Sequence, residues 1–469
     1  MFEPTLSIDL GASYTKVAYR PACLPSTAGT ATAEAKVLMV DNRPLIPSLA
    51  IRTRDPAQPW IFGRPAAAMN PNHEMQVFQN WKANLFRPQN DKDSVTAAII
   101  AHRFFDWLRL KLRQATPVGI DVTQCQTRIA MPAFDTFDEN AVLLARCMDL
   151  SGWNDPTLIL KVREPHANTL GLFAGGRNAV CRYADGRCEV SLRGVFEDDV
   201  YQNNVYFRAL QQFHVWGVRG NLLTVMVVDI GAFTTDLAKL TFDFNANADG
   251  LRAIQQESYA LGVINELDKP LIAELEVRHG FSWSDFSFEA QEGYKVLLYQ
   301  NQPWPLQARV NGVPTTIELG VGENHEVVAK ATRQFAAAVW EKIAPFTAGE
   351  TPSHIYLTGG GSRIKAVAEA LRGKIVDAGM HFVTVASGEA PIGTDDQRQW
   401  KHTGESLQRL ATAVGGASVI LQEASAPVHH GPAGLHPQPI PEPPAGFRTC
   451  RCQGGNKDCC FCGGRGYCP

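Results

Sequence analysis

Three glycine-bearing segments, far apart in the chain, contain the residues whose types and spacing are best suited to ligand binding and catalysis. They run from Ile8 to Ser13, from Asp229 to Asp236 and from Leu357 to Ser362. The first two each follow an apolar run typical of a buried strand, Thr5 to Ile8 and Leu223 to Val228. Each run leads into an Asp-x-Gly sequence, where the chain must turn sharply. A strand end of this kind presents a carboxylate beside bare backbone.

This combination of groups suits a triphosphate and its metal ion. Backbone N–H groups in a tight turn form a concave anion site, and nearby hydroxyls add hydrogen-bond donors. The hydroxyls available are those of Ser13, Thr15, Thr234 and Thr235. Asp9 and Asp229 would not contact phosphate directly but would hold a hydrated Mg²⁺ that bridges to the phosphate oxygens. No Gly-x-x-x-x-Gly-Lys-Ser/Thr run occurs, which excludes the Walker type of phosphate loop.

The third segment is suited to the other end of a nucleotide. A predicted strand, Ser353 to Leu357, leads into it, and an amphipathic helix is predicted from Arg363 to Arg372. The glycines between them would let a base and a ribose lie against the backbone at the start of the helix. The residues assigned to this role are Gly359, Gly360, Gly361, Ser362 and Arg363.

At these segments the sequence resembles the actin-like ATPase superfamily and, within it, the nucleotide-binding domain of the 70-kDa heat-shock chaperones. The resemblance runs from about Leu6 to about Val419 and includes further stretches in the same order as in the chaperones. These are Ile46–Ser48, Phe62–Ala66, Val77–Lys82, Ile129–Phe134 and Arg163–Gly171. One departure is Asn140, which stands where the chaperones carry an Arg that relays a proline switch.

The resemblance implies a role for each matched residue. Lys82 would supply a cation, Glu164 would orient the attacking water, and Thr234 would donate to the γ-phosphate. Asp9, Asp229 and Asp236 would position Mg²⁺ and its waters. The two phosphate loops would contact the phosphates through Gly11, Ala12, Ser13, Thr15, Gly231, Ala232 and Thr235.

The segment from Gln291 to Lys295 resembles the chaperone helix whose Glu and Lys bond the ribose hydroxyls. Glu292 and Lys295 are three residues apart and therefore share one face of a helix. The alternative interpretation is an exposed ion pair within the helix. Val296 stands where the chaperones usually place a long basic side chain against the adenine.

The expected fold class is α/β, as a bilobed actin-like ATPase with mixed sheets flanked by helices and a small zinc-knuckle-like segment at the C-terminus. The expected units are lobe I (1–175), an insertion (176–221), lobe II (222–389), a C-terminal helix returning to lobe I (390–423), a proline-rich linker (424–449) and a cysteine-rich tail (450–469). Helices are expected at Val95–Leu112, Glu139–Met148, Asn324–Pro345 and Glu405–Gln422. The insertion would either bind a partner or form a decorative hairpin.

Six of the eleven cysteines lie in the last twenty residues. Short paired spacings of thiolates in a reducing compartment favour tetrahedral Zn²⁺. The preferred ligands are Cys450, Cys452, Cys459 and Cys462, with Cys460 or Cys468 as substitutes. The tail resembles half of the zinc region of J-domain co-chaperones; a redox cluster and an unstructured reactive tail remain alternatives.

Composition limits the classes of partner. The formal net charge is −3 and no apolar run approaches the roughly 20 residues of a membrane span, so we expect neither nucleic acid nor a membrane as partner. The chain enters a strand without a signal-peptide pattern, which predicts a cytoplasmic protein.

These observations predict a cytoplasmic, Mg²⁺-dependent protein that binds ATP/ADP, hydrolyses ATP slowly and uses lobe closure as a switch. Its protein partner is unknown and would bind through the insertion and the tail. The resemblance ends near Gln422, so we expect no peptide-binding domain. Two alternatives are an actin-like filament or scaffold protein whose assembly ATP controls, and a small-molecule kinase of the same superfamily.

Overall fold

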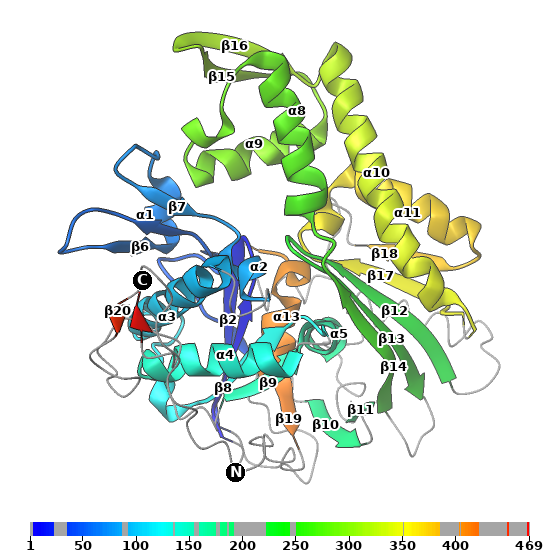
Figure 1. Cartoon of the computed structure of the whole chain (residues 1–469). Helices are drawn as coiled ribbons and strands as arrows, with labels where there is room; N and C mark the ends of the chain where they lie inside the picture. The colour runs from blue at the N-terminus through cyan, green and yellow to red at the C-terminus, as the bar shows by residue number, and fades with distance from the viewer. Residues whose placement is uncertain are drawn as a thin grey trace.

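The computed structural model describes most of the chain. The described residues are 3–22, 35–86, 92–134, 137–153, 159–174, 179–184, 187–191, 222–243, 250–349, 351–384, 403, 405–421, 448–449 and 467–468. The fold is mixed α/β, with several mixed sheets flanked by helices (Figure 1). The preferred zinc ligands Cys450, Cys452, Cys459 and Cys462, and most of the predicted insertion, lie outside the described residues.

The first large sheet has the strand order β3-β2-β1-β8-β9, with β4 paired to β2. Its strands are β1 (Thr5–Leu10), β2 (Tyr14–Arg20), β3 (Lys36–Val37), β4 (Ile46–Pro47), β8 (Gln126–Met131) and β9 (Ile159–Arg163). Strands β1, β2 and β3 form an antiparallel meander, while β8 and β9 run parallel to β1 on its other side. All six residues of β1 are buried, as a central strand with both faces covered requires.

The second large sheet has the order β18-β17-β12-β13-β14-β11-β10-β19. Its strands are β10 (Ala179–Ala184), β11 (Arg187–Ser191), β12 (Leu222–Ile230), β13 (Thr235–Asp243), β14 (Gly250–Tyr259), β17 (His354–Thr358), β18 (His381–Thr384) and β19 (Val419–Leu421). The described part of the predicted insertion, β10 and β11, pairs within this sheet.

The two sheets repeat one arrangement. In each, a three-stranded antiparallel meander (β1-β2-β3 or β12-β13-β14) is extended by two strands parallel to its first strand (β8-β9 or β17-β18). The first hairpins also share their register, because Asp9 lies opposite Lys16 and Asp229 lies opposite Asp236, each pair seven residues apart. The ends of β1 and β12 therefore present equivalent positions to the space between the sheets.

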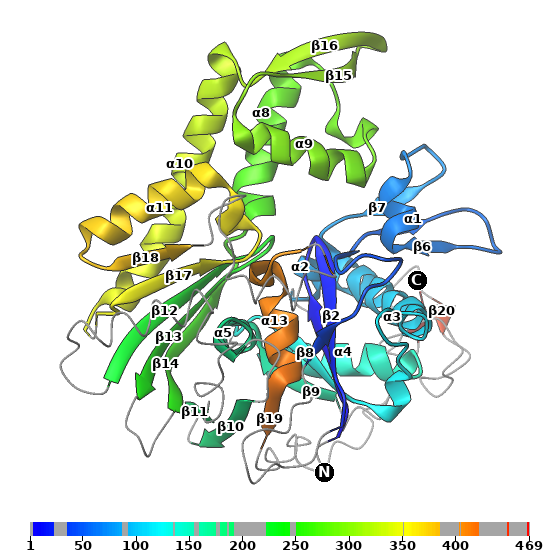
Figure 2. The ribbon, with the colours of Figure 1, turned by 180° about the vertical axis from the view of Figure 1, so that it is seen from behind.

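Helices cover both sheets (Figures 1 and 2). Their bounds are α1 (Gly63–Ala68), α2 (Trp81–Leu85), α3 (Lys92–Leu112), α4 (Phe137–Leu150), α5 (Glu164–Ala174), α8 (Lys269–His279), α9 (Phe288–Gln300), α10 (Gly322–Thr347), α11 (Lys365–Asp377) and α13 (Leu407–Ser418). Helix α3 buries one apolar stripe at helical spacing, with Ala97, Ala101, Phe104 and Leu108 in the core of the first sheet. Helices α10 and α11 bury theirs against the second sheet.

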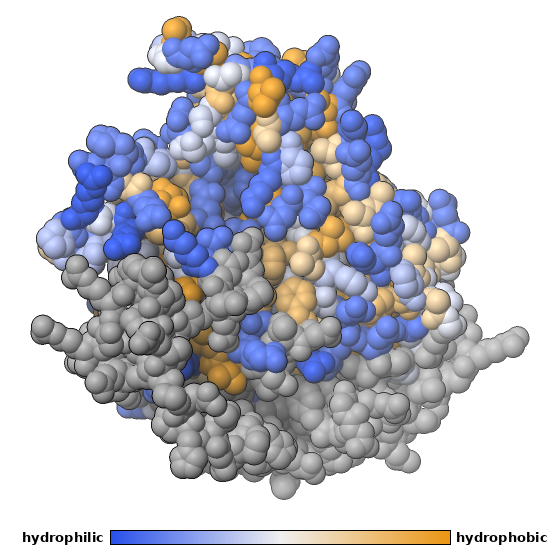
Figure 3. All heavy atoms as spheres, viewed as in Figure 1, coloured by the Kyte–Doolittle hydropathy of each residue, from blue (hydrophilic) through white to orange (hydrophobic). Residues whose placement is uncertain are grey.

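Smaller elements rise above the sheets. These are β5 (Ala50–Arg52), β6 (Trp60–Phe62) and β7 (Gln76–Phe78), a three-stranded sheet, and the hairpin of β15 (Trp304–Val310) and β16 (Val313–Leu319). Phe288 of α9 packs with Leu49, Ala66 and Ala67 from the part that contains α1. The face shown in Figure 3 is hollowed between the α1–β7 part and the α8–α9 part, and the residues around the hollow are mainly hydrophilic.

Helices α5 and α13 cross between the two large sheets (Figure 1). Their backbones touch, because a Cβ on Gly171 would lie 1.9 Å from the Ala411 carbonyl oxygen and one on Gly415 would lie 1.8 Å from the Ala167 carbonyl oxygen. Only glycine permits so close a crossing, so Gly171 and Gly415 determine how closely α5 and α13 approach each other.

The predicted helix Glu405–Gln422 was too long at both ends. Helix α13 spans Leu407–Ser418, and Val419–Leu421 form strand β19, which pairs with β10. Two buried arginines stop the helix: Arg20 donates to the Ala417 carbonyl (2.9 Å) and Arg128 donates to the Gly416 carbonyl (2.9 Å). They satisfy carbonyl groups that a helix end leaves without intrahelical partners.

Two further observations concern the ends of the fold. Strand β20 (Arg448–Thr449) pairs with β21 (Tyr467–Cys468), so the residues that flank 450–466 lie together. Among the described residues, the helices are all too short or too polar to cross a bilayer.

A substitution tests the helix crossing. We expect Gly415→Ala to lower the free energy of unfolding by about 1–3 kcal/mol, because the added methyl overlaps the α5 backbone. Gly373→Ala is the matched control, since Gly373 lies in α11 and a Cβ added there would meet no atom within 4 Å. This control should be neutral or stabilising by up to about 1 kcal/mol. Denaturant unfolding measures both, and equal effects would contradict the proposed role of Gly415.

Candidate functional site

The first candidate loop joins β1 to β2. Gly11 is required there, because a Cβ on it would lie 2.2 Å from the Tyr14 carbonyl oxygen. The cross-strand register brings Lys16 to Asp9, and Lys16 Nζ lies 2.8 Å from Asp9 Oδ2. Thr15 is fully buried with its hydroxyl 2.9 Å from Ser48 Oγ, so a contact from Thr15 to phosphate would require that bond to break.

The second candidate loop joins β12 to β13. The Gly231 N–H donates to the Thr234 carbonyl (2.8 Å) and closes the turn. Thr234 donates its hydroxyl to Asp236 Oδ2 (2.8 Å). Thr235 is fully buried and donates to the Leu261 carbonyl (2.6 Å), so this hydroxyl, predicted to contact phosphate, serves to anchor the loop in this conformation.

The predicted catalytic pair meets directly. Lys82 lies on α2 and Glu164 begins α5, and their Nζ and Oε1 atoms are 2.7 Å apart. Both side chains are buried. Burial raises the pKa of Glu164 to about 8; Lys82 opposes this rise, while the carboxylates of Asp236 and Asp9 add to it. A carboxylate with a raised pKa is a stronger proton acceptor than an exposed one.

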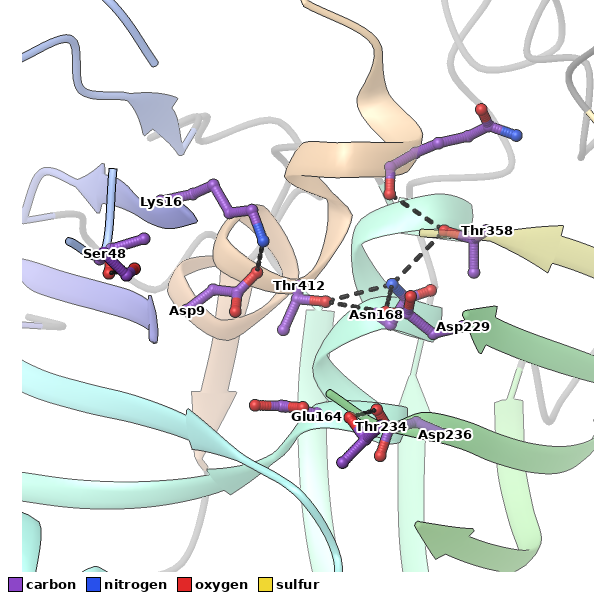
Figure 4. A network of polar contacts seen from close by, with 12 residues as sticks. Asp9, Lys16, Ser48, Glu164, Asn168, Asp229, Thr234, Asp236, Thr358 and Thr412 are labelled. Atoms are coloured by element: carbon purple, nitrogen blue, oxygen red, sulfur yellow. Dashed lines mark hydrogen bonds and ion pairs between the residues drawn. The ribbon is translucent and has the colours of Figure 1, made fainter. Parts of the chain in front are cut away.

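Asp229 is held by a polar network that joins four segments (Figure 4). Asn168 of α5 donates to Asp229 Oδ2 (2.7 Å) and also contacts Thr412 Oγ1 of α13 (3.1 Å). Thr358 at the end of β17 donates to the Gln408 carbonyl of α13 (3.0 Å) and lies 3.5 Å from Asn168 Nδ2. The network therefore fixes the carboxylate relative to the crossing helices.

Asp236 connects the site to the first sheet. It accepts hydrogen bonds from Thr234 and from Ser258 of β14, and the Ala133 N–H, just beyond β8, donates to Ser258 Oγ (2.6 Å). Burial raises the pKa of Asp236 to about 7, and the negative charge of Asp229 contributes to the rise.

The four acidic side chains form an electrostatically coupled group. Burial raises the pKa of Asp229 to about 7; Lys16 opposes the rise, and Asp9 and Glu164 reinforce it. Two lysines, Lys16 and Lys82, are paired with members of the group. Within the described part of the chain, no three His, Cys, Asp or Glu side chains converge closely enough to hold a metal ion directly.

The third segment, Leu357 to Ser362, packs against the end of β12. Gly359 has φ of +83°, and a Cβ on it would lie 2.1 Å from Asp229 Oδ1. A Cβ on Gly361 would lie 2.4 Å from Ile230 Cγ2, whereas Gly360 faces open space. Ser362 is buried and donates to the Gly359 carbonyl (2.8 Å), and Arg363 is exposed. The helix predicted from Arg363 begins instead at Lys365, because Gly361–Arg363 form a 3₁₀ turn.

Glu292 and Lys295 form an ion pair, as the alternative interpretation expected, but this pair is neither isolated nor fully exposed. Lys295 Nζ lies 2.8 Å from Glu292 Oε1 and 2.8 Å from Oδ2 of the buried Asp268, to which Tyr299 also donates. Helix α9, which carries Glu292 and Lys295, meets the first hairpin, because the rings of Phe288 and Tyr14 lie 5.8 Å apart between centroids. Burial raises the pKa of Tyr14, and the Glu292 charge adds to the rise.

An aromatic cluster borders the Lys82–Glu164 pair. Phe86, just after α2, stacks on Phe233 of the second loop with ring centroids 5.8 Å apart, and Phe134 meets both rings edge-on. Lys82 Nζ lies 6.0 Å from the centroid of Phe86. These rings cover one side of the Lys82–Glu164 pair with apolar surface.

Four residues of the site were not predicted from the sequence: Lys16, Asn168, Ser258 and Thr412. A signal for Lys16 was present, because Asp9 and Lys16 have the same seven-residue separation across a turn as Asp229 and Asp236. Asn168 gave none, since its partners Asp229 and Thr412 are 61 and 244 residues away in sequence.

A scan of the chain against protein-family models found no match, and a search of curated proteins also found none.

The carboxyls with raised pKa values predict a pH dependence of stability. A carboxyl whose pKa rises from 3.8 in the unfolded chain to about 7 on folding favours the folded state fully only below pH 3.8, and this contribution is lost as the pH rises through 7. We therefore expect the unfolding temperature to fall between about pH 4 and 7, and to fall less in Asp229→Asn. Differential scanning calorimetry measures both.

Asp377→Asn, an exposed change on α11, is the matched control and should keep the wild-type slope. If Asp229→Asn has that same slope, folding does not raise the pKa of Asp229.

Proposed function

We propose that this chain is a magnesium-dependent ATP-binding protein that hydrolyses ATP, built like the bilobed nucleotide-binding domain of the 70-kDa heat-shock chaperones. One observation carries the proposal: two hairpins of identical register bring Asp9, Asp229 and Asp236 together with Lys82 and Glu164 at the space between two equivalent sheets. In open α/β sheets, ligands bind at such strand ends.

The acidic residues suit a hydrated magnesium ion. Asp229 and Asp236 have pKa values raised by burial and by neighbouring carboxylates, and a divalent cation would relieve both effects. Since Mg²⁺ retains several waters, carboxylates that do not converge on one point can hold it through them. Asp9, Asp229 and Asp236 would hold the ion, which supplies charge neutralisation for the phosphate oxygens.

The remaining groups of the site would each have a separate role in hydrolysis. The Gly11 and Gly231 N–H groups close the two turns by donating to the Asp9 and Thr234 carbonyls, so the N–H groups that follow them, at Ala12–Ser13 and Ala232–Thr234, would bind the phosphates. Lys82, released from Glu164, would neutralise charge on the transferred phosphoryl group, and Glu164 would orient a water and accept its proton. The Phe86–Phe134–Phe233 cluster would keep bulk water from this side of the reaction.

The nucleoside would lie between the Gly359–Arg363 turn and α9. Gly360 leaves space beside the turn for a ring, and Glu292 and Lys295 have the polar atoms to bond ribose hydroxyls. Val296 is 60% exposed and offers only apolar contact to a base. We propose that lobe closure on the nucleotide changes the surface offered to a protein partner, with the cysteine-rich tail as a zinc-stabilised contact.

Hydrolysis is tested by phosphate release. We expect Lys82→Ala and Glu164→Gln to reduce turnover by at least about 100-fold, because each removes a group that acts on the reacting atoms. Both variants should still bind Mg·ADP in calorimetric titrations, and EDTA should abolish turnover of the wild type.

Lys330→Ala and Glu326→Gln, which alter exposed residues of α10, are the matched controls and should behave as wild type. Equal rates in all variants would reduce the function to binding alone, and no heat on titrating the wild type with Mg·ATP would end the proposal.

A further inference from the structure

Lys16 occupies an unusual position beside Asp9. Its ammonium lies 2.8 Å from Asp9 Oδ2, with only 17% of the lysine side chain and 8% of the aspartate side chain exposed. The same nitrogen lies over the backbone of Gly11, where an added Cβ would approach it to 3.3 Å. The ammonium therefore lies beside both the Asp9 carboxylate, as Figure 4 shows, and the backbone of the first turn.

The field of Lys16 also reaches the second hairpin. After burial itself, the charge of Lys16 has the largest influence on the pKa of Asp229, and it acts to lower that pKa. Lys16 thus acts on two of the carboxylates that we assign to the magnesium ion, on Asp9 by direct contact and on Asp229 through its charge. An ammonium in this place supplies the positive charge that a divalent cation would otherwise provide.

The equivalent position of the second hairpin makes the contrast clear. Asp236 stands there, opposite Asp229, where the first hairpin has Lys16 opposite Asp9. The two turns are therefore alike in backbone but opposite in the charge of this one residue. Across the first hairpin Lys16 faces Asp9, whereas across the second hairpin the carboxylate of Asp236 faces that of Asp229.

We propose that Lys16 is an internal counter-cation that competes with the divalent metal for Asp9, so that metal binding requires the nucleotide. When the metal–nucleotide complex enters, the Lys16 ammonium leaves Asp9 for a phosphate oxygen, which the length of its stem permits. Without a phosphate to receive it, the ammonium stays on Asp9 and weakens metal binding. This inference rests on the proposed function and adds an order: the metal enters with the nucleotide, not before it.

The test measures Mn²⁺ binding to nucleotide-free protein by electron paramagnetic resonance. We expect Lys16→Met, which keeps the length of the side chain and removes its charge, to bind Mn²⁺ at least about tenfold more tightly than wild type. Lys16→Arg retains a cation and should bind Mn²⁺ as weakly as wild type. The affinity of Lys16→Met for ADP should fall at least about tenfold, because its phosphate partner is lost.

Two further variants isolate the cause. Lys111→Met breaks a lysine–aspartate pair of similar length, 2.9 Å to Asp41, outside the site and should leave Mn²⁺ binding unchanged. Asp9→Asn/Lys16→Met should lose the gain, since the gain depends on the freed carboxylate. Circular dichroism establishes that each variant is folded, and Lys16→Gln replaces Lys16→Met if the latter is not.

The outcomes separate this inference from the proposed function. Equal Mn²⁺ affinities in wild type and the neutral variant overturn the counter-cation role, even where wild type binds Mg·ATP. A gain that persists in Asp9→Asn/Lys16→Met also overturns it. A gain confined to the neutral variant supports competition at Asp9. If wild type then binds no nucleotide, the proposed function and the order of entry both fail, while the competition between Lys16 and the metal at Asp9 stands.

Discussion

Burial of more negative than positive charge, where β1 and β12 end, is the constraint on which the rest of the site depends. Asp9, Glu164 and Asp236 are buried and Asp229 is partly buried, and their charges act on one another. Buried charges are costly unless they are paired or bind metal ions. Two lysines compensate part of the charge, and hydrogen bonds from Asn168, Thr234 and Ser258 compensate more. A site of this kind is stabilised further by any cation that enters it.

The crossing of α5 and α13 links the site to both large sheets. Glu164 and Asn168 lie on α5, Thr412 lies on α13, and the two helices touch through Gly171 and Gly415. Close-packed backbones transmit displacement because they cannot be compressed. If the chain binds a nucleotide as we propose, a movement of Asp229 relative to Asp9 on binding would shift the crossing, and with it the angle between the two sheets.

The periodic elements could be predicted from the sequence because local pattern suffices for them. The strands at Thr5 and Leu223, and the helices α3, α4 and α10, lie within a few residues of their expected bounds. Local pattern failed where a tertiary partner decides the outcome. The end of α13 is set by Arg20 and Arg128, which are hundreds of residues away in sequence, and the residues after it extend as β19 because β10 is there to pair with them.

The sequence by itself determined the chemical types available: acidic residues at strand ends, glycines that permit tight turns, and the lysine and the glutamate at positions 82 and 164. Composition and spacing carry this information because turns and strands are local. Only the tertiary structure decided which groups meet. It paired Lys82 with Glu164 and Lys16 with Asp9, and it gave the Thr15 and Thr235 hydroxyls to protein partners. Such choices depend on the register and on the crossing of distant segments, which no local spacing specifies.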